Sequence, residues 1–251
     1  MPMQKPKLLV LIVAYNAEET IQNVLLRIPQ SLLEDFLVEV LVLDDASSDR
    51  TFEQAQEILN TSKLPFKVHV LINPSNQMYG GNQKIGYHFA IVNDFDFVAL
   101  LHGDGQYAPE SLPELTRPLL SNLADAVFGS RMLVPGDARR GGMPLYKFVG
   151  NRILTWFQNR LLGANLSEFH SGYRVYSVKA LELIPFDRNT NDFHFDTEII
   201  IQFLFRKLRI VELPIPTYYG EEICRVNGLK YAWNVVFRPS RHIITISLMI
   251  W

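Results

Sequence analysis

The chain has 251 residues, of which 48% are hydrophobic and 20% charged, and its formal net charge is −2. These values are typical of a globular protein with a substantial core, and they exclude a disordered chain and a basic nucleic-acid-binding protein. A single cysteine, Cys224, excludes an internal disulfide and a cysteine-based zinc cluster, which fits a reducing cytoplasmic compartment.

Apolar runs that stop abruptly at polar residues alternate with segments of helical periodicity along the chain. The expected strands are residues 8–14, 38–45, 66–73, 95–105, 124–131, 169–177 and 210–220. The expected helices are residues 17–28, 48–59, 80–93, 109–120, a loop-to-helix segment over 132–163, and 195–208. This alternation predicts an α/β fold with a mostly parallel central sheet and helices on both faces.

Neither a repeat nor a linker interrupts the pattern, so residues 1–235 are expected to form one domain. Lysines and seven apolar residues near the N-terminus mimic a signal peptide, but Tyr15 and Asn16 stand where small cleavage-site residues are needed, which favours a first strand. The apolar stretch "HIITISLMIW" is about half of a spanning helix. Residues 236–251 are therefore expected to touch a membrane or to precede an anchor, with packing on the domain as the alternative.

Polar residues cluster where four of the expected strands end: Tyr15-Asn16, Asp44-Asp45, Asn73 and the stretch 102–106. Ligands of parallel α/β sheets bind beyond the carboxyl ends of the strands. The four clusters therefore predict one shared binding site at that edge of the sheet.

Asp104 and Gln106 offer two hard oxygen ligands in a turn, and glycines flank Asp104 on both sides. This arrangement suits Mg²⁺ or Mn²⁺ held together with diphosphate oxygens. The alternative is a turn in which Asp104 caps the helix that follows. Asp44 and Asp45 suit hydrogen bonds to a nucleoside base or ribose, and Tyr15 could pack against the base, although capping and simple packing would also explain them.

Arginines are scattered through the second half of the chain, and guanidinium groups suit phosphate recognition. Arg131 follows an expected strand directly, and Arg174 lies within "SGYR". These two are better placed for a ligand than the others, which are interpreted as surface residues: Arg139, Arg140, Arg152 and Arg225.

The chain resembles the family 2 glycosyltransferases with the GT-A fold, especially the branch related to polyprenyl- or dolichyl-phosphate sugar synthases. The matching stretches run in the family's order: "VLIVAYNAEETI", "VLDDASSDRT", "GGNQKIGY", "LLHGDGQYAPE", "VFGSR", "SGYRVYS" and "VELPIPTYY". Each stretch is weak alone, but the ordered set covers nearly the whole chain and is specific.

The resemblance implies an inverting hexosyltransferase that uses a nucleotide-diphospho-sugar (UDP- or GDP-linked) and Mg²⁺ or Mn²⁺. By that match, the nucleotide-sugar is bound by Ala14, Tyr15, Glu18, Asp45, Lys84, Asp104 and Arg131. Asp104 and Gln106 fall on the metal and diphosphate positions, and the catalytic set is Asp104, Glu168 and Arg174. The expected acceptor is a polyprenyl phosphate at the cytoplasmic face of a membrane.

Two departures from the family pattern bear on these roles. The acidic-x-acidic motif reads His102-Gly103-Asp104 here, so the first carboxylate is missing and His102 becomes a further candidate metal ligand. An Arg-x-x-Gly-x-Ser-Lys element of the family is matched by "RVNGLK", which is one residue shorter. The family's acceptor-binding residues are therefore the ones least safely assigned to positions of this sequence.

The acceptor decides whether a general base is required. A hydroxyl acceptor needs one, and Glu168 is the first candidate, with Asp196 behind it. A polyprenyl phosphate is already ionised, and Glu168 would then orient Arg174 or the metal, or be a plain surface residue. The alternatives are a transferase acting on a saccharide hydroxyl, a nucleotidyltransferase, which lacks its glycine-rich basic loop here, and a non-catalytic sugar-nucleotide-binding relative.

Overall fold

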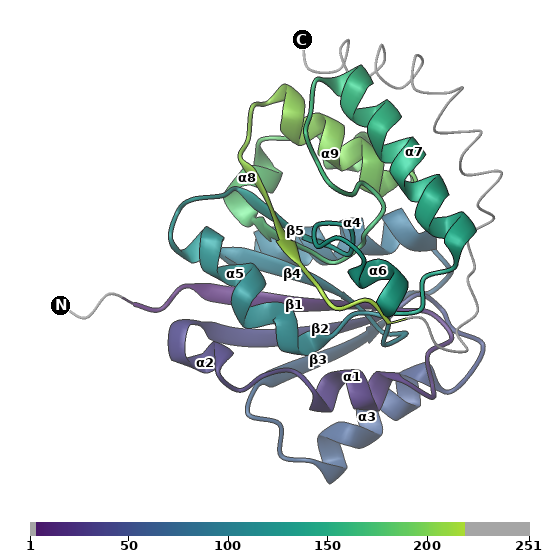
Figure 1. The fold of residues 1–251 in the computed structure, drawn as a ribbon. Coiled ribbons are helices and arrows are strands. Elements are labelled where there is room, and N and C mark those ends of the chain that lie inside the picture. Colours follow the sequence, from purple (N-terminus) through teal and green to yellow (C-terminus); the bar gives the residue numbers. More distant parts are fainter. Residues whose placement is uncertain (1–3, 219–251) are drawn as a thin grey trace.

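The computed structural model describes residues 4–218 and places seven strands in one sheet, in the order β3-β2-β1-β4-β6-β5-β7 (Figure 1). The strands are β1 (Lys7–Ala14), β2 (Leu37–Asp44), β3 (Lys67–Ile72), β4 (Phe97–His102), β5 (Ala126–Ser130), β6 (Arg174–Ser177) and β7 (Ile210–Pro214). Only β6 runs antiparallel to its neighbours within this sheet. The predicted mostly parallel α/β fold is confirmed.

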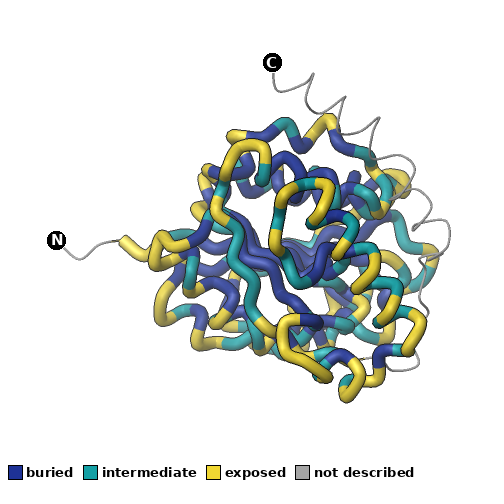
Figure 2. The backbone as a smooth tube through the Cα atoms, turned by 45° about the horizontal axis from the view of Figure 1, so that its top comes forward, coloured by how far each residue is buried: buried dark blue, intermediate teal, exposed yellow. Residues whose placement is uncertain are grey.

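Helices cover the sheet on both faces. They are α1 (Ile21–Leu26), α2 (Leu32–Asp35), α3 (Thr51–Thr61), α4 (Met78–Val92), α5 (Leu112–Leu120), α6 (Asp137–Arg140), α7 (Leu145–Leu162), α8 (Val178–Glu182) and α9 (Phe195–Phe205). One apolar cluster packs α1, α2, α3 and α5 on one face, and a second packs α4, α8 and α9 on the other. Figure 2 shows the strands buried between these layers. Strands buried on both faces explain the continuous apolar runs.

The antiparallel strand β6 determines which loops meet at the site. Its first residue, Arg174, pairs with Leu100 in β4 and with Phe128 in β5. Because β6 runs against both neighbours, the loop that leads into it lies at the edge where β4 and β5 end. The stretch 168–173 is therefore brought to the carboxyl edge of the parallel strands.

Among the expected elements that begin later than predicted, two show the largest shifts and bear on the site. Helix α1 starts at Ile21 rather than at residue 17, because the backbone N–H groups of Asn16 and Ala17 donate to the side chains of Ser47 and Thr51 at 2.8 and 2.7 Å. The expected strand over 169–177 is a strand only from Arg174. In both cases the residues that are not in regular structure form loops of the candidate site.

Several predictions fall outside the described residues: those for Cys224, for the "RVNGLK" stretch (Arg225, Gly228 and Lys230) and for the apolar segment 236–251. The single-domain boundary at residue 235 lies there as well. Within residues 4–218, no helix combines the length and the hydropathy that crossing a bilayer requires.

Close packing of α4 on β1 makes a stability prediction. A Cβ added at Gly86 would lie 2.2 and 2.5 Å from the two methyl carbons of Leu11, which is fully buried. Gly86→Ala should therefore lower the free energy of unfolding by about 1–3 kcal/mol through overpacking, measured by urea unfolding.

The matched control is Gly150→Ala in α7, where an added Cβ meets nothing within 4 Å. Alanine should raise the stability there by about 0.5–1 kcal/mol, because glycine loses more backbone freedom in a helix. Equal effects of the two substitutions would contradict the packing argument.

Candidate active site

The ends of the parallel strands are joined by hydrogen bonds between their backbones. Asp45 N–H donates to the Ala14 carbonyl at 2.9 Å, and Gly103 N–H donates to the Val13 carbonyl at 2.9 Å. Asn73 N–H extends the edge by donating to the Asp44 carbonyl at 2.8 Å. The polar clusters that follow β1, β2, β3 and β4 therefore share one edge, as the sequence predicted.

The loop after β1 is tied to the loop after β2. Asn16 adopts a left-handed backbone with φ of 50°, and its side-chain oxygen accepts from Ser48 N–H at 2.9 Å. Glu18 accepts from Arg50 N–H at 3.0 Å. Tyr15 is 44% exposed at the end of β1. Glu18 thus orders the loop pair beside Tyr15, and its predicted contact with a nucleoside stays a prediction.

Asp45 holds the start of α4 in place. One carboxylate oxygen, Oδ1, accepts from the Asn73 side chain at 2.8 Å and from Gln77 N–H at 2.7 Å. Asn73 also donates to Asn82 of α4 at 3.0 Å. This network fixes Asp45 at the centre of the edge, where its predicted role toward the nucleoside remains untested.

Asp104 is exposed directly beyond β4. Its Oδ1 accepts from Gln106 N–H at 3.1 Å, which closes a turn, and Gly105 between them has φ of 75°. The short helix that follows begins at Pro109, and no side chain caps it. The alternative that Asp104 caps this helix is therefore wrong, and the carboxylate points from a tight turn at the edge of the sheet.

The residues near Asp104 fit a cation that is held largely by a ligand's phosphates. Among residues 4–218, no three His, Cys, Asp or Glu side chains gather in a group that could hold a metal ion. An exposed carboxylate with an amide two residues away is the kind of open donor set that Mg²⁺ uses together with substrate phosphates and water. Asp104 and Gln106 would supply few ligands to such a cation, and both are hard oxygens.

His102 is packed between aromatic rings. Its Nε2 lies 3.1 Å from the Tyr79 hydroxyl, which in turn donates to Asp196 at 2.9 Å. Tyr107 contacts the ring edge-on at 4.9 Å between ring centres. Burial lowers the pKa of His102, against the opposing charges of Asp104 and Asp196. His102 is therefore a neutral imidazole in the wall of the site, and its proposed ligation of a metal stays a prediction.

Gly172 lets the loop before β6 pass close over this wall. A Cβ at that position would lie 2.7 Å from both His102 Cε1 and the Tyr79 hydroxyl oxygen. Gly172 N–H also donates to the Tyr107 hydroxyl at 2.8 Å. The glycine of "SGYR" is thus required by close approach rather than by an unusual backbone angle.

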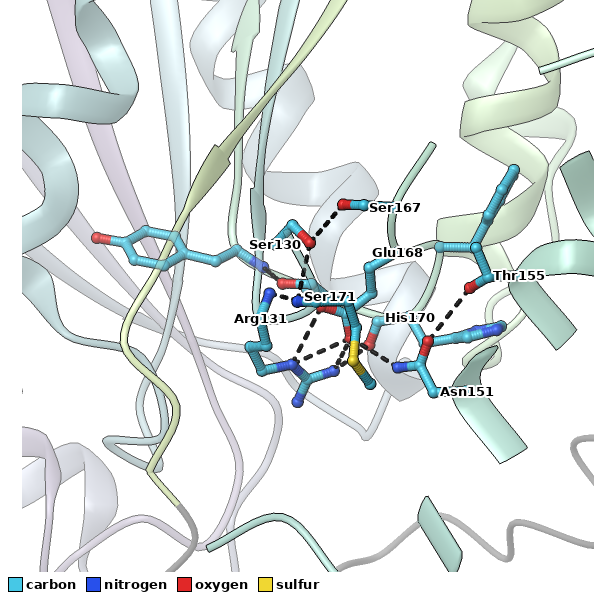
Figure 3. Close-up of polar contacts among 12 residues, drawn as sticks. Ser130, Arg131, Asn151, Thr155, Ser167, Glu168, His170 and Ser171 are labelled. Carbon is cyan, nitrogen blue, oxygen red and sulfur yellow. Dashed lines mark hydrogen bonds and ion pairs between the residues drawn. The ribbon is translucent and has the colours of Figure 1, made fainter. Parts of the chain in front are cut away.

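Arg131 and Glu168 form a buried ion pair at the same edge (Figure 3). Glu168 accepts from Arg131 N–H at 2.8 Å and from its Nε at 3.1 Å, and its side chain is 0% exposed. Asn151 of α7 donates to the same carboxylate at 2.8 Å. Glu168 therefore orients Arg131, whereas the sequence had suggested Arg174 or the metal. The interpretation of Glu168 as a plain surface residue is wrong.

The pairing keeps Glu168 ionised. Burial acts to raise the pKa of its carboxyl, but the charge of Arg131 and the hydrogen bonds from Arg131 and Asn151 outweigh burial, and the net shift is downward. A general base is most effective with a pKa near the working pH. A carboxylate whose pKa is lowered and whose oxygens are occupied is poorly suited to take a proton from a hydroxyl.

Arg174 lies beneath the site. It is 1% exposed, and its guanidinium donates to the carbonyls of Ser171, Phe169 and Asp196 at 2.9, 3.1 and 2.8 Å. These contacts hold the loop before β6 against α9. The predicted contact of Arg174 with a phosphate stays untested, and its position favours support of the loop.

Lys84 projects from the second turn of α4 toward the loop after the 3₁₀ turn η2 (Phe186–Arg188). Its ammonium donates to the Asn189 carbonyl and to the Asn191 side chain, the latter at 2.8 Å. Burial lowers its pKa, with opposing effects from Glu198 and Asp187. Lys84 therefore anchors the 189–191 loop to α4, and its contact with the sugar nucleotide is still a prediction.

Several supporting residues were not found from the sequence. Glu212 of β7 accepts from Ser167 N–H at 2.6 Å and from Glu168 N–H at 3.1 Å, and it holds the backbone of the ion pair. The sequence feature that could have identified Glu212 is an acidic residue inside an otherwise apolar strand. Tyr79 and Asn151 gave no signal, because their partners lie 23 and 17 residues away and meet them only in the fold.

Comparison with known proteins gives matches along most of the chain. The family model "Glycosyl transferase family 2" matches residues 9–184. A UDP-N-acetylglucosamine–dolichyl-phosphate N-acetylglucosaminyltransferase of Methanococcus voltae is 28% identical over 243 residues, covering 92% of this chain and 94% of the relative. An undecaprenyl-phosphate mannosyltransferase of Micrococcus luteus is 29% identical over 222 residues, covering 86% and 85%.

A solved structure confirms the fold. The crystal structure of glucosyl-3-phosphoglycerate synthase from Mycobacterium tuberculosis, in complex with Mn²⁺, UDP and phosphoglyceric acid, matches with a TM-score of 0.64. Its sequence identity is 19%, and the match covers 96% of this chain and 78% of that one. At this identity the likeness establishes the architecture and no more.

The Glu168–Arg131 pair predicts a pH-dependent stability. The folded-state pKa of Glu168 is lowered, so its contribution is complete above the unfolded value of about 4.3 and is lost as the pH falls through the folded pKa. Glu168→Gln should lower the free energy of unfolding by roughly 3 kcal/mol at neutral pH, because Arg131 loses its buried counter-charge.

Urea unfolding of the parent and the variant between about pH 3 and 8 measures this difference, which should be constant above about pH 5 and shrink below 4.3. Glu114→Gln, an exposed position on α5, is the control and should show little change. A difference that already shrinks between about pH 5 and 7 would mean that the pKa of Glu168 is raised.

Proposed function

The chain belongs to glycosyl transferase family 2, and on that premise we propose that it transfers a hexose from a nucleotide-diphospho-sugar to a polyprenyl phosphate. Residues 1–235 would form the catalytic domain, and the reaction would take place at the cytoplasmic face of a membrane. The observation that carries the choice of acceptor is the Glu168 carboxylate, which is engaged by Arg131 and Asn151.

The named relatives support a lipid-phosphate acceptor. The two relatives described above are named for transfer to dolichyl phosphate and to undecaprenyl phosphate, and each aligns over more than four fifths of both chains. Both acceptors present the same chemistry, a phosphate monoester at the end of a long isoprenoid chain. We extend that acceptor class to this chain.

A structural neighbour supports the donor and the metal. Glucosyl-3-phosphoglycerate synthase was crystallised with UDP and either Mn²⁺ or Mg²⁺, and with UDP-glucose in a further complex. In this chain the corresponding proposal is a nucleotide-diphospho-sugar beside Tyr15 and Asp45. Asp104, assisted by Gln106, would hold the cation. When bound, the cation would offset the negative charge that grows on the leaving diphosphate.

The transfer step needs no proton to be moved. An oxygen of the acceptor phosphate attacks the anomeric carbon and forms the new C–O bond. The bond from that carbon to the diphosphate oxygen breaks, and its electron pair leaves with the nucleoside diphosphate. Attack from the face opposite the leaving group inverts the anomeric centre. The acceptor phosphate is ionised at neutral pH, so no side chain has to deprotonate it.

The candidate bases of the chain are consistent with such an acceptor. Glu168 has a lowered pKa and is paired with Arg131. Asp196 accepts from Tyr79 at 2.9 Å and lies 3.6 Å from the Arg174 guanidinium. A saccharide hydroxyl would need one of these carboxylates to leave its partners. The ion-paired state therefore favours the lipid phosphate over the hydroxyl acceptor.

A transfer assay with matched acceptors tests the proposal. The full chain is incubated with radiolabelled UDP- and GDP-hexoses and Mn²⁺, with undecaprenyl phosphate in detergent or with a panel of soluble oligosaccharides. Label should enter the organic phase with undecaprenyl phosphate, and the product should release the sugar on mild acid treatment. Label found only in soluble saccharide would overturn the lipid acceptor and favour the hydroxyl alternative.

Asp104→Ala should reduce metal-dependent transfer by at least about a hundredfold, since loss of charge stabilisation at a leaving group has costs of this size. Because Asp104 is exposed, the melting temperature of the variant should stay within about a degree of the parent's, since surface substitutions have small effects on stability.

Asp35→Ala is the matched control. Asp35 is an exposed aspartate just before β2, at the amino ends of the strands and so at the opposite edge of the sheet, and it should keep full activity. Normal transfer activity of the Asp104→Ala variant would show that Asp104 does not hold the metal.

A further inference from the structure

Thr20 stands at the N-cap of α1, but its side chain does not cap the helix. A threonine at this position ordinarily accepts a hydrogen bond from a backbone N–H group of the first turn, and Thr20 makes no such bond. Its hydroxyl instead donates to the Gly103 carbonyl at 2.6 Å. The Ala17 carbonyl lies 3.3 Å away, which is beyond the usual length of an O–H···O bond. The one proton of the hydroxyl is therefore committed to the end of β4.

This bond fixes the residue that precedes Asp104. The N–H group of Gly103 donates to the Val13 carbonyl at 2.9 Å, and its carbonyl accepts from Thr20. A Cβ added at Gly103 would lie 3.0 Å from the Ala14 Cβ. Strand β1 and helix α1 thus hold both polar groups of the Gly103 backbone, which sets the direction in which the chain leaves β4 toward Asp104.

Thr20 also lies beside the residue that follows Asp104. A Cβ added at Gly105 would lie 3.8 Å from the Thr20 Cβ and 3.9 Å from its methyl carbon. Gly105 has φ of 75°, a left-handed backbone that glycine adopts without steric cost. Glycine also has the most backbone freedom to lose, so a turn with glycines on both sides of Asp104 needs outside contacts to keep one conformation. Thr20 supplies such contacts on both sides.

The far end of the same turn is held by the loop before β6 and by β6 itself. The Tyr107 hydroxyl accepts from Gly172 N–H at 2.8 Å, and the Tyr173 hydroxyl donates to the Ala108 carbonyl at 2.9 Å. The stretch 104–106, which carries both candidate metal ligands, therefore lies between two anchored ends. Thr20 provides the anchor at the end nearer to Asp104.

Helix α1 reaches this segment at a second point, through Arg27 directly after its last residue. The Arg27 guanidinium donates twice to the Glu110 carboxylate, both times at 2.8 Å. The two side chains are 34% and 54% exposed, and ion pairs as exposed as this one contribute little. The partly buried Thr20 hydroxyl is therefore the contact of α1 that matters for the turn.

We propose that Thr20 is a positioning residue that holds Asp104 in the geometry needed to bind the divalent cation of the donor complex. The inference rests on the proposed function for the role of Asp104 itself. Because the protein would offer the cation few ligands, a turn that is ordered before binding spares the complex the cost of ordering it. Residues that orient metal ligands typically contribute about 10- to 100-fold to metal affinity.

Nucleotide binding measures this role without any turnover. Isothermal titration calorimetry of the full chain gives the dissociation constants of UDP and GDP with and without Mn²⁺. The ratio of the two constants for the tighter-binding nucleotide is the coupling between nucleotide and cation. Thr20→Val keeps the shape of the side chain but removes the hydroxyl. It should lower the ratio about tenfold and leave nucleotide binding without Mn²⁺ as in the parent.

Thr116→Val is the matched control. The Thr116 hydroxyl also donates to carbonyls, those of Leu112 and Pro113 at 3.0 and 3.1 Å, but both lie within α5. This variant should keep the parent's ratio. Thr20→Ser retains a hydroxyl and should restore most of the ratio. Thr20→Ala removes the same hydroxyl without the valine methyl groups, and it keeps the inference testable if Thr20→Val does not fold.

Asp104→Ala separates this inference from the proposed function. It should abolish the effect of Mn²⁺ on nucleotide binding. If it does so while Thr20→Val and Thr20→Ala keep the parent's ratio, the positioning role is overturned and the metal site at Asp104 stands. If Asp104→Ala keeps the parent's ratio, or if Mn²⁺ has no effect on the parent, the metal site at Asp104 is overturned and the positioning role with it.

One further result would count against Thr20 alone. If the Thr20 variants weaken nucleotide binding equally with and without Mn²⁺, the residue supports the loop after β1 and not the turn that carries Asp104. Melting temperatures of the same samples show whether each variant is folded.

Discussion

The Glu168 carboxylate is the contact through which the separate parts of the candidate site meet. It is bound by Arg131 at the end of β5 and by Asn151 on α7, and Glu212 of β7 fixes the backbone beneath it. A buried carboxylate is tolerated only when its charge is balanced and its oxygens are hydrogen-bonded. Removing either the arginine or the amide would leave that carboxylate without its counter-charge or without one of its hydrogen bonds. The ion pair therefore holds β5, α7 and the loop before β6 in fixed relative positions.

This constraint also shapes the chemistry of the site. A carboxylate that is held ionised by an arginine cannot readily serve as a general base, and Asp196 is similarly engaged by Tyr79 and Arg174. An acceptor that brings its own negative oxygen removes the need for a base. The same commitment turns Asn151 and Thr155 of α7 inward. The proposed acceptor chemistry thus rests on this buried ion pair.

The candidate site was only partly predictable. Asp45, Asp104 and Arg131 could be chosen because each lies within two residues of the end of an apolar strand, and strand ends gather at one edge of a parallel sheet. The engagement of Glu168 by Arg131 could not be predicted, since a salt bridge across 37 residues leaves no local pattern. Burial of Arg174 also escaped prediction, because neither its sequence neighbours nor its charge indicated that three backbone carbonyls would surround it.

The sequence by itself determined the order and type of most elements, because strands buried on both faces and helices buried on one have distinct hydrophobic periods. It also predicted that the polar clusters after four strands share one edge of the sheet, and the structure brings them together there. Tertiary structure alone decided that β6 inserts antiparallel between β4 and β5, which brings residues 168–173 to that edge. It alone decided which face of α7 turns toward the ion pair. Both outcomes depend on contacts between residues distant in the chain, whose energies no local pattern of the sequence records.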